Sequence, residues 1–117
     1  MNLTSICTSN YYSLDSMALI LAGHRLGIPT INIQHGVQSK THPAFTRWLN
    51  IPRNGYEILP NEFHCWDPLS SDIIWDWAKT TNKHSSKVVG YPWAYSWKNG
   101  DLSFLPQLSY TFPIIVL

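Results

Sequence analysis

Charged side chains are scarce in this chain of 117 residues: they make up 13% of the sequence, against 44% for hydrophobic residues. About a quarter of the residues of a soluble domain are ordinarily charged. A surface this poor in charge therefore predicts that further protein covers one face of the domain. The formal net charge of +1 offers no field that would recruit nucleic acid or an anionic membrane. We therefore expect no nucleic-acid partner.

Cysteine is rarer still, with 2 residues in the chain. Cys7 and Cys65 belong to no Cys-x-x-Cys or Cys/His ligand pattern, and we predict both to be reduced strand residues of a cytoplasmic protein. Residues 1–10 have no basic stretch and no apolar core, which argues against a secretory signal. The longest apolar run, residues 17–22, is far below the roughly 20 residues that cross a bilayer. Membrane association of the full-length protein would therefore be peripheral, at the inner membrane.

Several motifs that mark cofactor or nucleophile sites are missing from the sequence. There is no GxxxxGK[ST] phosphate loop and no GxSxG nucleophile turn. The stretch Gly23–Gly27 is not a GxGxxG fingerprint, and His24, His64 and His84 occur at no metal-ligand spacing. We expect no metal and no bound cofactor, and we assign these three histidines no site.

The first third of the chain contains a strand–helix–strand pattern. Residues 5–9 predict a short strand, and Ser13 or Asp15 can cap a helix whose apolar residues recur at spacings of three and four. Gly27 and Pro29 end that helix, and residues 30–34 predict a second strand that is covered on both faces. One such unit requires a parallel sheet. The apolar stripe of the helix comprises Leu14, Met17, Ala18, Leu21, Ala22 and Leu26.

The rest of the chain predicts a second unit of the same kind after a long loop. Residues 37–60 show no sustained period, and their aromatic residues suggest that the loop packs onto something. A third strand at residues 62–67 precedes a helix that Asp67 caps and Pro68 begins. Residues 87–90 predict a fourth strand, residues 94–110 show no period, and residues 112–117 begin another buried strand.

The order of these landmarks resembles a known family. Along the chain stand Tyr-Tyr-Ser at a helix start, Gly-Ile-Pro-Thr at a strand start, Ile-Gln-His-Gly, a proline-containing loop, Trp66-Asp67 and Val88-Val89-Gly90-Tyr91-Pro92. This order resembles bacterial glycosyltransferases of the GT-B fold, chiefly those of capsule and surface polysaccharide synthesis. It is more loosely similar to CDP-glycerol glycerophosphotransferases. The resemblance covers roughly residues 5–93.

The resemblance implies an enzyme with two Rossmann-like domains and a cleft between them. Residues 1–93 would be the C-terminal half of the acceptor-side domain, residues 94–111 the interdomain linker, and residues 112–117 the first strand of a donor-binding domain. It also implies a nucleotide-sugar donor as co-substrate and a glycan acceptor. By itself this chain would then be inactive.

The candidate site follows from where the second strand ends. Open α/β sheets bind ligands at the carboxyl ends of their strands, and His35 and Gly36 stand there. A transferase of the resembled family needs a general base, and histidine, whose ordinary pKa is about 6.5, suits that role at His35. Gly36 permits close backbone approach and positive φ. Gln34, Asn10 and Tyr11 lie at the same predicted edge, where they can hydrogen-bond an acceptor sugar.

Other readings of the sequence stay open. A sugar-nucleotide epimerase uses the same fold and cleft, and a flavodoxin-like binding module would use the sheet without catalysis. Asp15 and Asp67 read first as helix caps. The loop residues Lys40, His42, Arg47 and Arg53 could face an anionic substrate or simply be solvated, and Gly90 to Pro92 would shape the hinge entry.

Overall fold

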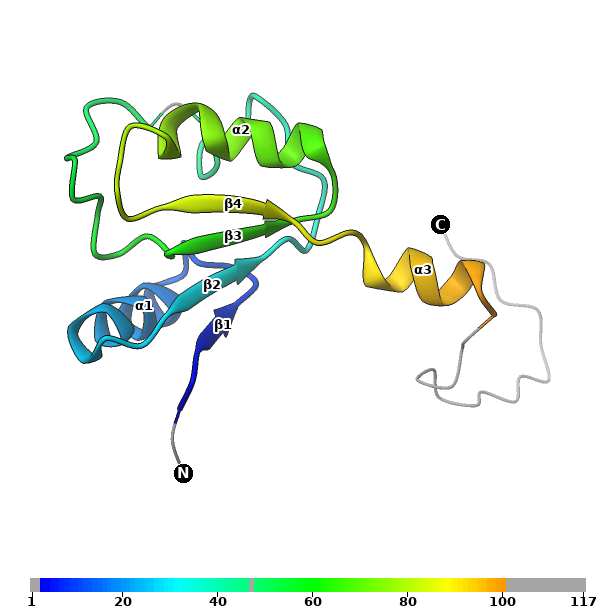
Figure 1. The fold of residues 1–117 in the computed structure, drawn as a ribbon, viewed down its shortest axis with the longest axis horizontal. Helices are drawn as coiled ribbons and strands as arrows, with labels where there is room; N and C mark the ends of the chain where they lie inside the picture. The colour runs from blue at the N-terminus through cyan, green and yellow to red at the C-terminus, as the bar shows by residue number, and fades with distance from the viewer. Residues whose placement is uncertain (1–2, 47, 101–117) are drawn as a thin grey trace.

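The computed structural model describes residues 3–46 and 48–100 (Figure 1). The elements in chain order are β1 (Ile6–Thr8), α1 (Leu14–Leu26), β2 (Thr30–Ile33), β3 (Glu62–Cys65), α2 (Pro68–Ala78), β4 (Ser85–Val88) and α3 (Pro92–Lys98). The strands form one sheet in the order β1-β2-β3-β4, and every neighbouring pair is parallel. This confirms the predicted α/β fold, a Rossmann-like parallel sheet with flanking helices.

Local sequence signals determine where the two longer helices begin and end. The Ser13 side chain accepts a hydrogen bond from the Ser16 amide, and Gly27 ends α1 with φ +68°, as glycine does at a C-cap. Asp67 accepts from the Ser70 amide at the start of α2. The predicted caps at Ser13 and Asp67 are thus confirmed, and the ends of α1 and the start of α2 lie where the sequence places them.

Both helices pack on the same face of the sheet. Register pairs Asn32 of β2 with Phe63 of β3, so their side chains share a face. On that face a Cβ added to Gly23 of α1 would lie 2.6 Å from Thr30, and the ring of Trp77 in α2 lies 5.7 Å from that of Phe63. The two helices and the sheet therefore enclose a single core.

The loop at residues 37–60 closes this core. The rings of Phe45, Tyr11 and Phe63 meet edge to face at 5.5 to 6.5 Å, a favourable geometry for aromatic pairs. The Trp77 indole nitrogen donates to the carbonyl of Phe45 over 3.0 Å. The aromatic residues of the loop do pack down, and they pack onto the helix-bearing face.

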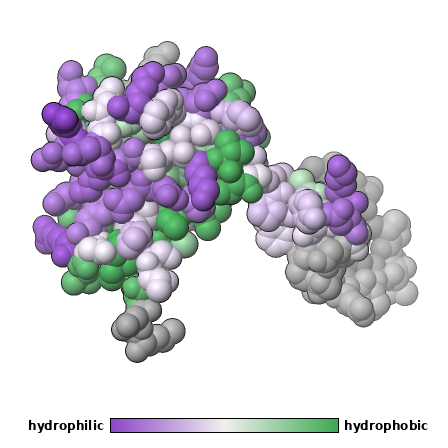
Figure 2. Space-filling view, in the orientation of Figure 1, coloured by the Kyte–Doolittle hydropathy of each residue, from purple (hydrophilic) through white to green (hydrophobic). Residues whose placement is uncertain are grey.

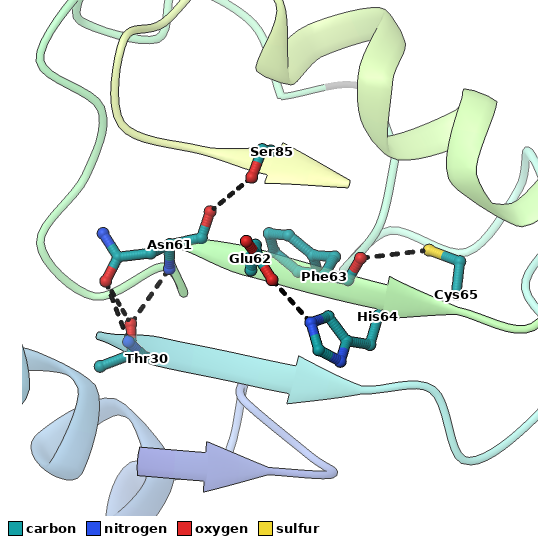
Figure 3. Close-up of polar contacts among 7 residues, drawn as sticks. All are labelled: Thr30, Asn61, Glu62, Phe63, His64, Cys65 and Ser85. Carbon is teal, nitrogen blue, oxygen red and sulfur yellow. Dashed lines mark hydrogen bonds and ion pairs between the residues drawn. The ribbon is translucent and has the colours of Figure 1, made fainter. Parts of the chain in front are cut away.

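The opposite face of the sheet is open, which corrects the expectation that β2 is covered on both faces. Ile33 is 44% exposed, and Cys7 is an exposed free thiol. Glu62 and His64 form an ion pair of 2.6 Å on β3, on the other side from Phe63 (Figure 3). Parallel sheets are ordinarily buried on both faces, so this face lacks its usual second layer within residues 3–46 and 48–100.

The apolar stripe of α1 is also largely uncovered, contrary to the prediction. Leu14 is 85% and Leu26 72% exposed, and the buried residues of α1 are Ile20 and Gly23. The physical reason is that α1 contacts only β1 and β2, at the edge of the described sheet. In Figure 2 hydrophobic patches accordingly interrupt the hydrophilic surface at the lower margin of the body and on the side from which α3 leaves.

The last described elements differ from the predicted ones in position. β4 begins at Ser85, two residues before the predicted start, because the Ser85 amide donates to Asn61 over 2.9 Å and extends the ladder. Where a linker is predicted from residue 94, Pro92 starts α3 instead. α3 leaves the sheet and buries no residue (Figure 1), and its 7 residues are too few to show a helical period. The predicted strand at 112–117 lies outside the described residues.

No helix within the described ranges is both long and apolar enough to cross a bilayer.

Candidate functional site

A small cavity of about 160 Å³ opens at the carboxyl end of β2. Two of its lining residues, His35 and Gly36, are those that the sequence singles out. The others come from the loop that follows and from the chain just before α1. The full lining comprises Tyr12, His35, Gly36, Val37, Gln38, His42 and Phe45.

The two predicted residues are accessible and sterically free. His35 is exposed at the end of β2, and no hydrogen bond engages its ring within the described part of the chain. Gly36 does not adopt the positive φ that the sequence suggested. A Cβ added there would meet no atom within 4 Å, so what Gly36 contributes is open space beside the imidazole.

Gln38 and His42 supply polar groups that sequence reasoning did not assign. Gln38 is 6% exposed, and its buried Oε1 has no hydrogen-bond partner in the described structure. Most buried polar atoms have a partner. The Nδ1 of His42 accepts from the Ala44 amide over 3.3 Å, so a neutral His42 carries its proton on Nε2. The cavity thus offers a donor at His42, and the unpartnered Oε1 of Gln38 lies buried in its wall.

Aromatic rings complete one side of this cavity. The ring of His42 lies 4.9 Å from that of Phe45 and 6.0 Å from that of Tyr12. Packed rings of this kind hold an imidazole in a fixed orientation. An apolar wall next to hydrogen-bonding groups suits a ligand with both a hydroxyl-bearing and a C–H-bearing surface.

Gln34 lies beneath the cavity and is engaged by the protein. Its Nε2 donates to the Gly36 carbonyl over 2.9 Å and to the Ser70 hydroxyl over 3.2 Å, while its Oε1 accepts from the Trp66 amide over 2.7 Å. The residue is 3% exposed. Gln34 therefore ties the turn at Gly36 to the end of β3 and the start of α2. The predicted sugar contact through Gln34 would have to compete with these bonds.

Asn10 and Tyr11 do not line the cavity. Tyr11 is fully buried, its hydroxyl donates to the carbonyl of Ala44, and burial raises its pKa. Asn10 is exposed, and its carbonyl accepts from Ser13 in the turn before α1. The next residue, Tyr12, is the one that reaches the cavity. The turn after β1 breaks the strand alternation, so the sequence alone does not indicate which of the two tyrosine rings points outward.

The N-terminus of α2 borders the same edge of the sheet. Asp67 accepts from both the amide and the hydroxyl of Ser70, each over 2.9 Å, and these bonds lower the pKa of its carboxyl group. Trp66 and Tyr91 stack with ring centroids 4.1 Å apart. Asp67 is thus occupied as a cap, and the stacked pair joins the end of β3 to the start of the α3 segment.

A larger cavity, of about 610 Å³, lies between the loop and the C-terminal half of α2. Its indoles point their N–H groups into the protein: Trp48 donates to Ala44 and Trp77 to Phe45. The Thr46 and Thr80 hydroxyls likewise donate to nearby carbonyls. These polar groups are satisfied internally, and Lys40, Asn50 and Asp76 border the apolar surface that the other lining residues present. It contains none of the predicted site residues.

The loop charges are spread out. Lys40 lines the larger cavity, His42 the smaller one, and Arg53 is exposed; Arg47 lies outside the described residues. No cluster of three or more His, Cys, Asp or Glu that could hold a metal ion occurs in the described ranges. At the smaller cavity the imidazole groups can form hydrogen bonds and transfer protons, and the amide group can form hydrogen bonds.

No family model, no curated protein and no solved structure matches the chain.

Proposed function

We propose that this chain is the acceptor-side part of a GT-B glycosyltransferase that acts in the cytoplasm on a surface glycan, and that the cavity at His35 holds the acceptor hydroxyl. The observation that carries the proposal is a cavity lined by two imidazoles and by Gln38, whose buried Oε1 has no hydrogen-bond partner in the described residues. A sugar hydroxyl donates one hydrogen bond and accepts others. The hydroxyl that donates to His35 can therefore accept from Nε2–H of His42 at the same time.

In this proposal His35 is the general base. It accepts the proton of the acceptor hydroxyl as the hydroxyl oxygen attacks the sugar of the nucleotide-sugar donor, and the nucleotide leaves with the bonding electron pair. The Nε2–H group of His42 donates a hydrogen bond to the acceptor sugar and so orients the sugar ring. Gly36 leaves space for the sugar ring, because a Cβ placed on Gly36 would meet no atom within 4 Å.

The size of the cavity limits what it can hold. Sites for whole drug-sized ligands run from about 300 to 1,000 Å³, and this one is about 160 Å³. It has room for a single sugar unit or part of one, and none for a nucleotide sugar as well. The donor would have to be bound by a second domain, as in the two-domain architecture that the resemblance implies.

The first arm of the test measures ligand binding by NMR on the isotope-labelled chain. Glucose, galactose, N-acetylglucosamine and glycerol are titrated in turn, and the histidine ring and backbone signals are followed. We expect saturable shifts at His35, Gly36, Gln38 and His42. Thr80→Ala, in the larger cavity, is the control that should leave them unchanged. Shifts gathered around Thr80, or none with any ligand, would contradict the proposal.

The second arm uses the complete enzyme and a panel of nucleotide sugars. His35→Ala should abolish transfer while donor binding persists, and His64→Ala, on the open face of the sheet, should transfer normally. Epimerised donor without transfer would favour the epimerase reading. Binding without any turnover would favour the flavodoxin-like binding module.

A further inference from the structure

At the opposite end of the sheet, a buried histidine holds the long loop. His84 precedes β4 and is 4% exposed. Its Nδ1 lies 2.7 Å from the carbonyl oxygen of Pro60, and its Nε2 lies 3.0 Å from the amide nitrogen of Tyr56. A carbonyl only accepts and an amide N–H only donates. The partners therefore fix a neutral ring with its proton on Nδ1.

We propose that His84 is a proton-operated latch that closes residues 52–60 over the core when it is neutral and releases them when it is protonated. A second proton would go to Nε2, which would then point its N–H at the N–H of Tyr56. Two donors facing each other cannot bond, and the new charge would be buried. Protonation therefore breaks the Tyr56 contact specifically, while the bond to Pro60 can persist.

The surroundings of His84 disfavour the cation on balance. Burial lowers the pKa of His84 most, and Lys83, beside it in the chain, and His24 from α1 lower it further, while the bond to the Pro60 carbonyl acts in the opposite direction. Glu57, in the loop, acts on His24. No ion pair to a carboxylate is formed by His84 in the described structure. The latch therefore opens on the acid side of neutrality.

Release would loosen more than one hydrogen bond. The ring of Tyr56 packs at 6.0 Å from that of Trp48, and Trp48 is a wall of the larger cavity. Gly55 fits against the imidazole so closely that a Cβ there would lie 2.2 Å from Nε2. A separate bond, from the Asn82 amide to the Arg53 carbonyl over 3.0 Å, keeps the start of the segment attached. The opening is thus expected to be local.

The experiment is amide hydrogen exchange by NMR on the whole chain between pH 8 and pH 5. We expect the protection factor of the Tyr56 amide to be constant above about pH 6.5 and then to fall about tenfold per pH unit, as one proton uptake requires. The Trp66 amide, which donates to Gln34 at the other end of the sheet, should keep its protection. Constant protection at Tyr56, or a parallel fall at Trp66, would overturn the latch.

His84→Gln is the matched variant, since its amide can serve Tyr56 but cannot titrate. Its Tyr56 protection should be independent of pH, whereas His24→Gln should retain the wild-type dependence. A fall of Tyr56 protection in His84→Gln like that of the wild type would overturn the proposal.

A third measurement needs no variant. The NMR signals of the His84 ring nitrogens should report an Nδ1–H tautomer at pH 8, and the scalar coupling across the Tyr56 N–H···Nε2 hydrogen bond should vanish as the ring titrates. A persistent coupling would count equally against the latch.

Discussion

The two ends of the sheet engage their polar side chains differently, although at the amino end the buried Nδ1 of His24 also has no partner in the described residues. At the amino end Asn61 bonds the strands on both sides of it: Thr30 bonds its side-chain oxygen and its amide at 3.0 Å, and the Ser85 amide and hydroxyl donate to its carbonyl (Figure 3). At the carboxyl end His35 stays exposed, and Gln38 keeps a buried oxygen without a partner in the described residues. Satisfied groups stabilise a fold, and unsatisfied ones are available to a ligand. In the function proposed above, the amino end serves stability and the carboxyl end serves recognition.

The largest effect is expected from Gly55→Ala, at the amino end. Gly55 has φ +67°, and the new Cβ would lie 2.2 Å from the buried ring of His84. Left-handed strain costs about 1–2 kcal/mol and overpacking about 1–3 kcal/mol. Urea unfolding should therefore show a loss of about 3 kcal/mol. A loss below about 1 kcal/mol would mean that the loop yields freely at this end.

A smaller loss is expected when Gln34 is replaced by Ala. The change leaves the part-buried amide of Trp66 without its partner at 2.7 Å, and a fully buried donor left unsatisfied costs about 1–3 kcal/mol, so we expect a loss toward the lower end of that range. Gln38→Ala is the matched control, because its oxygen has no partner to lose; we expect its free energy of unfolding to stay within about 0.5 kcal/mol of the wild type. Equal losses in the two glutamine variants would erase the distinction between positioning and ligand-facing residues.

Acid should weaken the amino end first. Burial lowers the pKa of His84 in the folded chain, so the unfolded chain takes up a proton first as the pH falls. The stability is complete above about pH 6.5 and declines below it, by at most about 1.4 kcal/mol per pH unit for one proton, until the folded-state pKa is passed. The hydrogen bonds that lower the pKa of Asp67 are lost only at much lower pH. Urea midpoints from pH 8 to pH 5 should shift less in His84→Gln than in the wild type.

The smallest effect on stability is expected from His35→Ala. The side chain is exposed and forms no hydrogen bond in the described structure, and such substitutions usually change stability by less than about 0.5 kcal/mol. Saccharide binding should weaken at the same time. Thermal unfolding and the sugar titration, run on one sample, would separate the two quantities.

The sequence was informative where local chemistry decides the structure. Ser13, Gly27 and Asp67 mark helix ends by hydrogen bonding or backbone conformation alone, and the alternation of strands and helices determines the parallel sheet. His35 and Gly36 could be placed at a strand end for the same reason. These features need no knowledge of distant contacts.

What could not be predicted depends on contacts between distant segments. Gln38 and His42 line the cavity because the loop that carries them and Phe45 folds back toward Tyr12. The exposure of Leu14 and the open face at Ile33 depend on which layers are present, and the apolar period of a helix is the same whether or not its stripe is covered. The latch at His84 joins residues 24 to 28 positions apart.

The most direct test of the division between the two ends is Gly36→Val. Nothing lies within 4 Å of a Cβ at Gly36, so the larger side chain should fill the cavity beside His35 without straining the fold. The account predicts a free energy of unfolding within about 0.5 kcal/mol of the wild type, together with loss of the saccharide-induced shifts at His35 and Gln38. Unchanged saccharide binding in a fully stable Gly36→Val chain would contradict it.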